Sequence, residues 1–502
     1  SLTESDQLYR DLLDLTVTNW LEPARFRAEY LAINQMGGVQ QSVPRTLVQM
    51  QANNTSDYED MIARLQAVPE LVDQEIALLQ RGLESGITPP QITLRDVPEQ
   101  VNNLLVDDPL TSPMLSAFTR FPESVPERER ERLTEEAVEA FTTGVLPAYE
   151  TLRDFLSDTY IPGARTSIAA SDLPNGSEWY ASRVRRYTTT DLTPQEIHDL
   201  GLSEVSRIRA EMDSIVALTG FAGTFADFLE FLRTDPQFYH DDAESLLSAY
   251  RDISKRADPE LARLFGRLPR LPYGIRQIPS YAEKSQTTAY YQGGSTEAGR
   301  PGYFFANTYN LPARPKWEMV ALTLHEAVPG HHLQIALAQE MEAVPEFRKH
   351  TGYTAFVEGW ALYAESLGEE MGLYQDPYSK FGQLTYEMWR AIRLVVDTGM
   401  HALGWTRQQA IDFFMENTGK TEHDITVEVD RYIVWPGQAL AYKIGELKIQ
   451  ELRAYAAGEL GDQFDIRAFH DEVLRRGALP LGALERFVRH WVSEQQAALE
   501  QG

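Results

Sequence analysis

The most informative stretch of the sequence is His325-Glu326-Ala327-Val328-Pro329-Gly330-His331-His332. It places three imidazoles and one carboxylate within eight residues. The run before it, residues 316–324, is predicted to form a helix with its apolar residues on one side. A His-Glu pair followed within a turn or two by another His is typical of metallopeptidases. In these enzymes the histidines bind zinc and the Glu accepts a proton from the attacking water. The stretch therefore predicts a metal-binding helix, with Glu326 as the proton acceptor.

The spacing between the histidines departs from the usual His-Glu-x-x-His pattern, because Pro329 occupies the position of the second His. On an ideal helix His331 would point about 240° away from His325, whereas His332 would share its face but lie about 10 Å further along. Pro329 cannot continue the helical hydrogen bonds and Gly330 tolerates almost any geometry, so a bulge there could bring His331 beside His325. We therefore expect His331 to be the second ligand and His332 to lie behind the ligands or to contact substrate. The alternative is a kinked core helix with hydrogen-bonded histidines.

A second apolar run, residues 356–365, is predicted to form a helix that carries two carboxylates. Glu358 and Glu365 are seven residues apart, so two helical turns bring them to one face. A carboxylate among aromatic and aliphatic side chains is costly to bury unless a cation or strong donors compensate. Gly359 would let a neighbouring helix approach Glu358 closely. We expect Glu358 to be the third metal ligand and Glu365 to orient a ligand histidine. An ordinary exposed position for Glu358 is the alternative.

Three segments, residues 324–334, 357–363 and 435–445, carry a resemblance to a known family. They are similar to the large bacterial family known as domain of unknown function 885. The similarity runs from about Tyr180 to the C-terminus, and we expect it to cover the whole chain. That family's fold resembles the carboxypeptidase Taq family of glutamate-zinc peptidases. The resemblance implies a large, mainly α-helical, metallopeptidase-like fold with a deep cleft, a peptide substrate and, by family analogy, a homodimer. Its Gly-His pair also favours His331 over His332 as ligand.

Residues 389–401 are predicted to form an apolar helix that bears Arg390, Arg393, Asp397 and His401. The Ile-Arg pair and the Asp four residues later are similar to a helix of the carboxypeptidase Taq family in which the Arg takes the substrate carboxylate. The resemblance implies that Arg393 binds the substrate carboxylate, and we expect Arg390, on the same apolar helix, to bind substrate as well. An internal Arg393–Asp397 salt bridge would explain the same spacing. We expect Asp397 and His401 to hold other residues of the site in position without binding the metal themselves.

A further segment, residues 430–443, contains Tyr432, Tyr442 and Lys443. Related helical zinc peptidases carry Tyr or His donors at about this distance after the metal motif, and such donors stabilise the oxyanion of the tetrahedral intermediate. The two tyrosines would be about 15 Å apart on a straight helix, so both can serve only if Pro436-Gly437 bends the path. We expect Lys443 to contact substrate. A place in the core is the alternative for either Tyr.

The composition indicates a large soluble protein. The chain has 502 residues, of which 43% are hydrophobic and 24% charged, and it has no Cys, which leaves His, Asp and Glu as metal donors. A net charge of −28 disfavours nucleic acid and anionic membranes as partners. No apolar run approaches the ~20 residues that span a membrane, and no signal peptide opens the chain. Because the first residue is Ser1, a leader could have been removed, so a cytoplasmic and an exported protein are both compatible with the sequence.

The chain is predicted to contain a helical N-terminal region, residues 1–160, and a catalytic region, residues 161–502. A loop rich in Pro, Gly and Ser is expected at residues 161–178. Strand signals gather at residues 287–292 and 302–309, which flank a Gly-rich turn and predict a hairpin just before the metal helix. This hairpin either holds the substrate backbone by strand addition or only stabilises the fold.

These residues predict zinc-dependent hydrolysis of peptide bonds in short peptides, with one zinc per chain held by His325, His331 and Glu358. Carboxypeptidase action is favoured over aminopeptidase action, because residues 270–320 lack the Gly-x-Met-Glu-Asn element that binds a substrate amine. Endopeptidase action stays open. The alternatives are another metal-dependent amide or ester hydrolase and a non-catalytic peptide-binding protein with a structural zinc.

Overall fold

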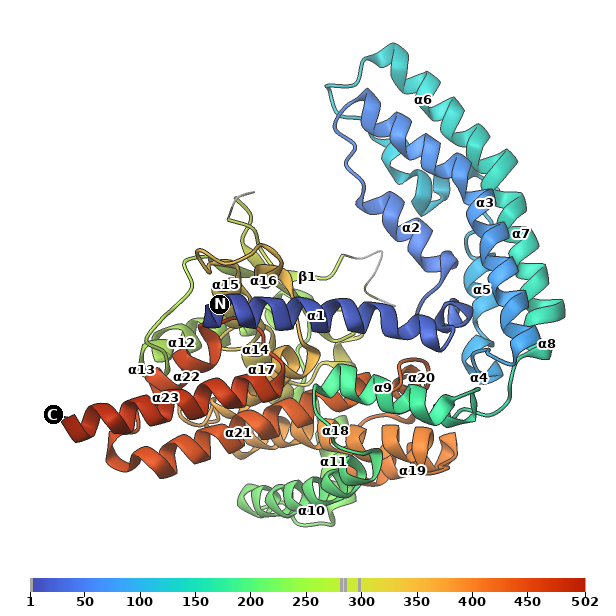
Figure 1. Ribbon diagram of the computed structural model, residues 1–502. Coiled ribbons are helices and arrows are strands. Elements are labelled where there is room, and N and C mark those ends of the chain that lie inside the picture. The colour runs from blue at the N-terminus through green and yellow to red at the C-terminus, as the bar shows by residue number, and fades with distance from the viewer. Residues whose placement is uncertain (1–2, 280–282, 284–286, 297–298, 502) are drawn as a thin grey trace. The chain divides into compact units, whose positions relative to one another are not determined.

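The protein is mainly α-helical. The computed structural model describes residues 3–279, 283, 287–296 and 299–501, and it is 71% helical with one small three-stranded sheet (Figure 1). This confirms the predicted fold class. The chain divides into two compact units, Ser1–Trp179 and Tyr180–Gly502. The boundary that the sequence suggested, between residues 160 and 161, falls inside the first of these units.

The described part of the first unit contains helices and no strand. Its α-helices are α1 (Glu4–Arg25), α2 (Val39–Gln49), α3 (Thr55–Ser85), α4 (Gln91–Leu94), α5 (Val97–Asn102), α6 (Glu127–Ala140), α7 (Leu146–Phe155), α8 (Ile161–Gly163) and the start of α9 (Gly176–Thr188). Two π-helical turns join α6 to α7 and α7 to α8, and this long run packs along α3 (Figure 1). Apolar residues of these helices, such as Leu65, Phe141 and Leu152, form the core of the unit.

The second unit holds all the residues that the sequence singled out for chemistry. Its remaining helices are α10 (Pro194–Thr219), α11 (Phe225–Thr234), α12 (Ala243–Ala257), α13 (Leu261–Leu264), α14 (Met319–Glu326), α15 (His331–Gln339), α16 (Phe347–His350), α17 (Thr354–Ser366), α18 (Pro377–Ala402), α19 (Arg407–Asn417), α20 (Glu422–Val434), α21 (Ala441–Leu460), α22 (Ile466–Leu474) and α23 (Leu481–Gln501). Its strands are β1 (Tyr273–Gln277), β2 (Ala289–Gln292) and β3 (Gly302–Ala306).

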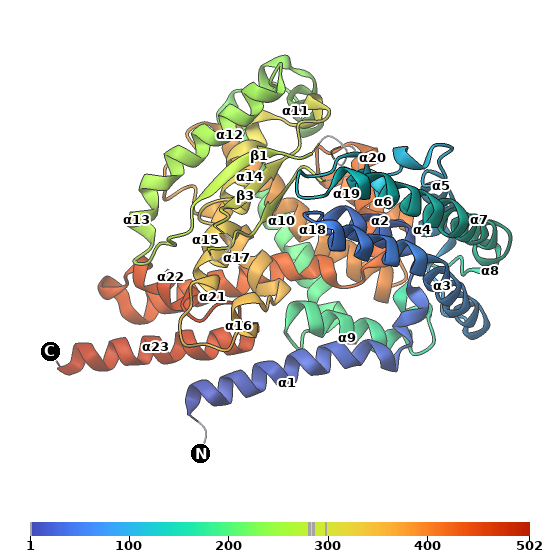
Figure 2. The ribbon, with the colours of Figure 1, turned by 90° about the horizontal axis from the view of Figure 1, so that it is seen from above.

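The sheet has the strand order β1-β3-β2. The predicted hairpin is confirmed: β2 and β3 are antiparallel, with Ala289 opposite Ala306. Strand β1 was missed, because its sequence, Tyr-Gly-Ile-Arg-Gln, has little apolar alternation and its burial is only partial; it pairs in parallel with β3. Helix α12 lies beside the sheet, where the rings of Tyr250 and Phe304 are 5.0 Å apart (Figure 2).

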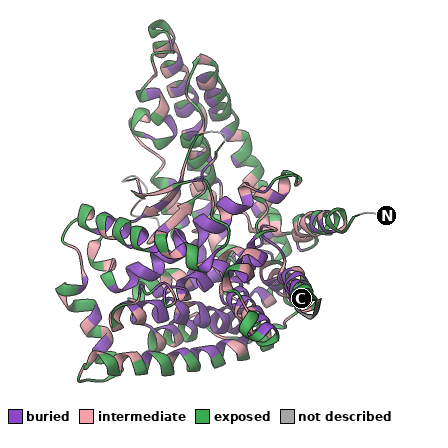
Figure 3. Ribbon diagram, turned by 90° about the vertical axis from the view of Figure 1, so that its left-hand side faces the viewer, coloured by how far each residue is buried: buried purple, intermediate pink, exposed green. Residues whose placement is uncertain are grey.

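Close helix packing brings the chemistry-bearing helices together. Helix α17 packs on α21 through Gly359 and Gly445, where a Cβ on either residue would collide with the backbone of the other helix. This confirms the predicted role of Gly359. Residues 391–400 of α18 are all buried, and Figure 3 shows buried residues concentrated in the inner helices of this unit. None of the described helices is both long and apolar enough to cross a membrane.

Candidate metal centre and its pocket

The metal motif spans a sharp break between two helices. Helix α14 ends at Glu326 and α15 begins at His331. Gly330 lies directly against the carbonyl oxygens of residues 324 and 325, where any side chain would collide, and Trp360 donates a hydrogen bond of 2.8 Å to the carbonyl of Pro329. The break places the rings of His325 and His331 4.7 Å apart between centroids, as the Pro-Gly pair predicts.

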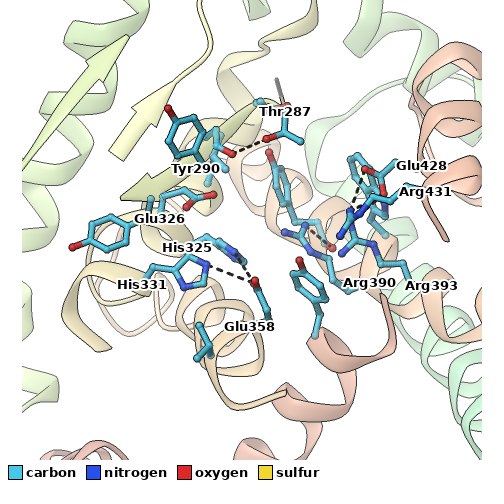
Figure 4. A pocket seen from close by; sticks show the side chains of 18 of the residues that line it. Thr287, Tyr290, His325, Glu326, His331, Glu358, Arg390, Arg393, Glu428 and Arg431 are labelled. Atoms are coloured by element: carbon cyan, nitrogen blue, oxygen red, sulfur yellow. Dashed lines mark hydrogen bonds and ion pairs between the residues drawn. The ribbon is translucent and has the colours of Figure 1, made fainter. Parts of the chain in front are cut away.

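His325, His331 and Glu358 form one group of potential metal donors, with the ligand atoms all within 4.8 Å of one another. Nε2 of His325 lies 3.6 Å from Oε2 of Glu358, and Nε2 of His331 lies 3.5 Å from the same oxygen (Figure 4). These distances exceed ordinary hydrogen bonds. A tetrahedral zinc bound at about 2.0–2.2 Å from each donor separates neighbouring donors by roughly 3.4 Å. The residue types and their spacing therefore fit a zinc ion.

Glu365 lies behind the donor group, fully buried. Its Oε1 accepts a hydrogen bond of 2.8 Å from Nδ1 of His325, which leaves Nε2 as the atom that faces Glu358. Burial alone would lower the pKa of His325, but Glu358 and Glu365 raise it to about 9. Burial would raise the pKa of Glu358, whereas His331 and His325 hold it well below its usual value. The raised pKa of His325 and the lowered pKa of Glu358 show that this position favours positive charge, as a bound cation would require.

His332 points away from this group. Its Nε2 donates to the carbonyl of Leu271 at 3.0 Å, and its Nδ1 accepts from the hydroxyl of Tyr291 at 2.9 Å. Burial lowers the pKa of His332 to about 4, so the ring is neutral at pH 7. It is not among the described residues that line the pocket, and the structure joins it to β2 rather than to the position of a substrate.

The donor group opens into a pocket of about 430 Å³. Glu326 lines this pocket, and Figure 4 shows its side chain on the same side of the pocket as His325 and His331. The lining residues come from β2 and its flank, α14, α15, α17, α18, α20 and α21: Thr287, Thr288, Ala289, Tyr290, Tyr291, Leu322, His325, Glu326, His331, Ile335, Val357, Glu358, Tyr386, Trp389, Arg390, Arg393, Glu428, Arg431 and Tyr442.

Arg390 and Arg393 also line the pocket, on α18. Nε of Arg393 donates to the hydroxyl of Tyr432 at 2.9 Å, and its guanidinium lies 4.6 Å from the ring centre of Tyr442. Asp397 is not its partner: this carboxylate accepts hydrogen bonds from the hydroxyl of Tyr180 and the backbone of residue 437. The alternative of an internal Arg393–Asp397 salt bridge is therefore wrong.

Of the four remaining predicted residues, one lines the pocket and three are buried outside its lining. Tyr442 lines the pocket, whereas Tyr432 is buried and its hydroxyl is occupied by Arg393 and by Trp389. Lys443 is fully buried against Glu387, Glu446 and Glu204, so it does not reach the pocket. His401 is buried and its Nε2 lies 2.9 Å from the carbonyl oxygen of residue 432, which supports its expected place behind the site.

Two charged residues of the pocket had no role in the sequence-based prediction. Arg431 and Glu428 of α20 are three residues apart and form an ion pair of 3.3 Å. Glu428 also lies 3.3 Å from Nη2 of Arg393. In the sequence, the feature that could have indicated them was the spacing of three residues between Glu428 and Arg431. Acidic and basic residues at this spacing are common on solvated helix surfaces, so the spacing did not point to a pocket.

Comparisons with known proteins relate the whole chain to others. Residues 1–488 match a family model described as "Bacterial protein of unknown function (DUF885)". The crystal structure of a "putative lipoprotein" from Colwellia psychrerythraea superimposes with a TM-score of 0.88 at 32% identity, over 92% of this chain and 81% of that one. A "putative lipoprotein of unknown function" from Shewanella oneidensis has a TM-score of 0.71 at 17% identity, over 97% of this chain and 88% of that one, and this likeness shows the fold alone.

A search of curated proteins gives no match to the chain. The family model, in contrast, covers nearly all of it, including the donor group and the pocket. The chain belongs to the DUF885 family of bacterial proteins.

Proposed function

We propose that the chain is a zinc-dependent peptidase that acts at the C-terminal end of short peptides. One observation carries the proposal: two imidazoles and a carboxylate converge at metal-ligand spacing in a pocket that also contains a separate carboxylate, Glu326. The resemblance to the carboxypeptidase Taq family of glutamate-zinc peptidases forms part of the same proposal.

His325, His331 and Glu358 would hold the metal. Among the described residues the group contains three protein donors, the number typical of catalytic zinc sites, whereas structural sites usually have four. This number favours a hydrolase over the alternative of a structural zinc. Zinc bound here would supply a Lewis acid that polarises a carbonyl and lowers the pKa of water.

Glu326 is the residue that moves the proton. Its carboxylate would take a proton from the attacking water and then pass that proton to the leaving amine nitrogen. The side chain is 7% exposed, so bulk water does not compete strongly for this carboxylate. Its place next to the ligand His325 in the chain keeps the base beside the donor group in the pocket.

Arg393 and Arg390 would bind the terminal carboxylate of the peptide. Tyr432 fixes Arg393, and Nε of Arg390 is buried without a hydrogen-bond partner among the residues that the structure describes. A buried guanidinium makes a strong, bidentate contact with a carboxylate. Such a contact would hold the last peptide bonds of the substrate in the pocket.

Strand β2 would align the peptide backbone. It is an edge strand, paired on one side with β3, and its other side pairs with no strand of the described chain. Residues 289–291 of this strand line the pocket. An extended peptide can pair with such an edge through main-chain hydrogen bonds.

Three versions of one short peptide test the proposal: the free form, the C-terminally amidated form and the N-acetylated form, digested by the zinc-loaded protein. We expect the free and acetylated forms to be cleaved near the C-terminus. Amidation should lower kcat/KM by roughly 10²-fold, because it removes the partner of a buried Arg. Arg393→Gln should reduce the difference in kcat/KM between the free and the amidated peptide.

Each other result contradicts a defined part of the proposal. Equal cleavage of free and amidated forms would indicate an endopeptidase, and sensitivity to acetylation alone would indicate an aminopeptidase. Hydrolysis of a simple ester or a non-peptide amide, with no cleavage of any peptide, would assign the chain to another class of hydrolase.

A further inference from the structure

We infer that the arginine-lined end of the pocket binds two carboxylates, so that the preferred substrates are peptides whose C-terminal residue has an acidic side chain. Arg431 would be the residue that determines this preference. The inference rests on the proposed function and adds the class of substrate to it.

The charges of the pocket are separated into two groups. Figure 4 shows Arg390, Arg393 and Arg431 on one side and the donor group on the other. The arginine side holds three guanidinium groups, and two carboxylates form ion pairs with them among the described residues: Glu428 with Arg393 and Arg431, and Glu365 with Arg390. A terminal carboxylate held by Arg390 and Arg393 would not use Arg431, which also lines the pocket.

The donor side supplies no carboxylate to Arg431. Its two pocket carboxylates, Glu326 and Glu358, would be balanced by one divalent cation. Glu365 lies 3.7 Å from Nη2 of Arg390 and compensates part of the charge of that arginine. Among the described residues, the charge partner of Arg431 is Glu428, at 3.3 Å, so a carboxylate of the ligand would give Arg431 a second and closer partner.

Glu428 is shared between two arginines rather than bound tightly to one. Its Oε2 lies 3.3 Å from Arg393 and 3.3 Å from Arg431, longer than the 2.7–2.9 Å of strong charge-assisted hydrogen bonds. Both guanidinium groups thus retain donors for a ligand. Although the chain carries a net charge of −28, three arginines lie together at this end of the pocket.

Besides its ion pair with Glu428, Arg431 makes two neutral contacts that hold it in position. Its Nη2 donates to Oε1 of Gln438 at 2.7 Å, and its guanidinium lies 5.6 Å from the ring centre of Trp435. Arg393 and Arg390 would take the terminal carboxylate, and Arg431 would take the carboxylate of the last side chain. An amide in that side chain has the same shape but no charge.

Matched peptides that end in Glu or in Gln test this inference on the unmodified, zinc-loaded protein. We expect kcat/KM to be about 10-fold or more higher for the peptide that ends in Glu, the size of a charge-assisted contact. Arg431→Gln should bring the Glu-to-Gln ratio close to one. Arg431→Lys, which keeps the charge but not the planar fork, should retain part of the preference. Arg467→Gln, which removes an exposed charge on α22, should not change the ratio.

Binding to the zinc-free protein gives a measurement that does not depend on turnover. By calorimetry, N-acetylglutamate should bind about 10-fold or more tightly than N-acetylglutamine, and Arg431→Gln should remove most of this difference. Selective binding without hydrolysis of any peptide would overturn the proposed function and leave the two-carboxylate site standing.

The inference is overturned if the unmodified protein treats Glu and Gln alike, in cleavage and in binding. A preference that Arg431→Gln leaves intact would overturn the role of Arg431. Inorganic phosphate that binds more tightly than N-acetylglutamate, through the same Arg, would replace the two carboxylates by a phosphate group.

Discussion

Nδ1 of His325 donates a hydrogen bond of 2.8 Å to a carboxylate oxygen of Glu365, which is completely buried. The two residues are 40 positions apart in the chain, on α14 and α17. The contact fixes the ring so that Nε2 faces Glu358 and the pocket. Carboxylates that orient a ligand histidine in this way also raise its basicity.

The first prediction concerns this contact. Glu365→Gln should weaken zinc binding by roughly 10- to 100-fold without abolishing it, because the amide can still accept the hydrogen bond but carries no charge. Competition with a chelator measures the affinity. Glu369→Gln, at an exposed position just beyond the same helix, is the matched control. An affinity that is equal in Glu365→Gln and unmodified protein would contradict the role given to Glu365.

The second prediction concerns the ligands themselves. His325→Ala, His331→Ala and Glu358→Ala should each lose the zinc, whereas His332→Ala should retain it, because His332 is held by Leu271 and Tyr291. Metal analysis of purified protein gives the stoichiometry directly. Loss of zinc in His332→Ala together with its retention in His331→Ala would show that the two histidines have been assigned the wrong way round.

The third prediction concerns the pH dependence of zinc affinity. Two carboxylates raise the pKa of His325 to about 9 in the metal-free protein, so below that pH zinc must displace a proton from this ring. The pKa of Glu358 lies well below its usual value, and this carboxylate adds no competing proton near neutrality. Apparent affinity should therefore rise about 10-fold per pH unit from pH 7 and level off above 9. An affinity that does not change with pH would contradict this account.

The fourth prediction concerns stability. Burial raises the pKa of Asp397 to about 7, although hydrogen bonds from Tyr180 and Gly437 oppose the shift. The folded chain thus binds a proton here that the unfolded chain, with a pKa of about 3.9, has lost. The free energy of unfolding contributed by Asp397 must therefore fall as pH rises from about 4 to 7 and stay constant above that.

Asp397→Asn removes this dependence, because the amide does not ionise. Relative to the unmodified protein, the free energy of unfolding of the variant should rise between pH 4 and 7, by at most about 4 kcal/mol for a shift of three pKa units, and its relative Tm should rise with it. Thermal unfolding at several pH values measures it. A Tm difference of constant size across this range would show that Asp397 titrates normally in the folded protein.

The sequence predicted the donor group because local geometry governs it. Pro329 and Gly330 allow one kind of break between α14 and α15, and that break selects His331 over His332. Glu358 and Glu365 followed from helical periodicity, and the apolar residues around them signalled a buried helix. These features depend on residues close together in the chain.

The sequence did not predict the partners of charged residues in distant helices. Lys443 looked like a substrate contact, but α18 and α10 supply carboxylates that bury it. Arg393 and Asp397 have the spacing of a helical ion pair, yet Tyr432 and Tyr180 are their partners. Only the packing of helices far apart in the chain decides such pairings.

The central claim is that zinc and Glu326 together hydrolyse peptides. It is tested most directly by measuring zinc content and the rate of peptide cleavage on the same samples of unmodified protein and Glu326→Gln. The account predicts about one zinc per chain in both proteins. It also predicts a rate that is lower by roughly 10²-fold or more in Glu326→Gln, because this variant keeps the shape of the side chain but cannot accept the proton. A Glu326→Gln protein that holds zinc and cleaves peptide at the unmodified rate would contradict it.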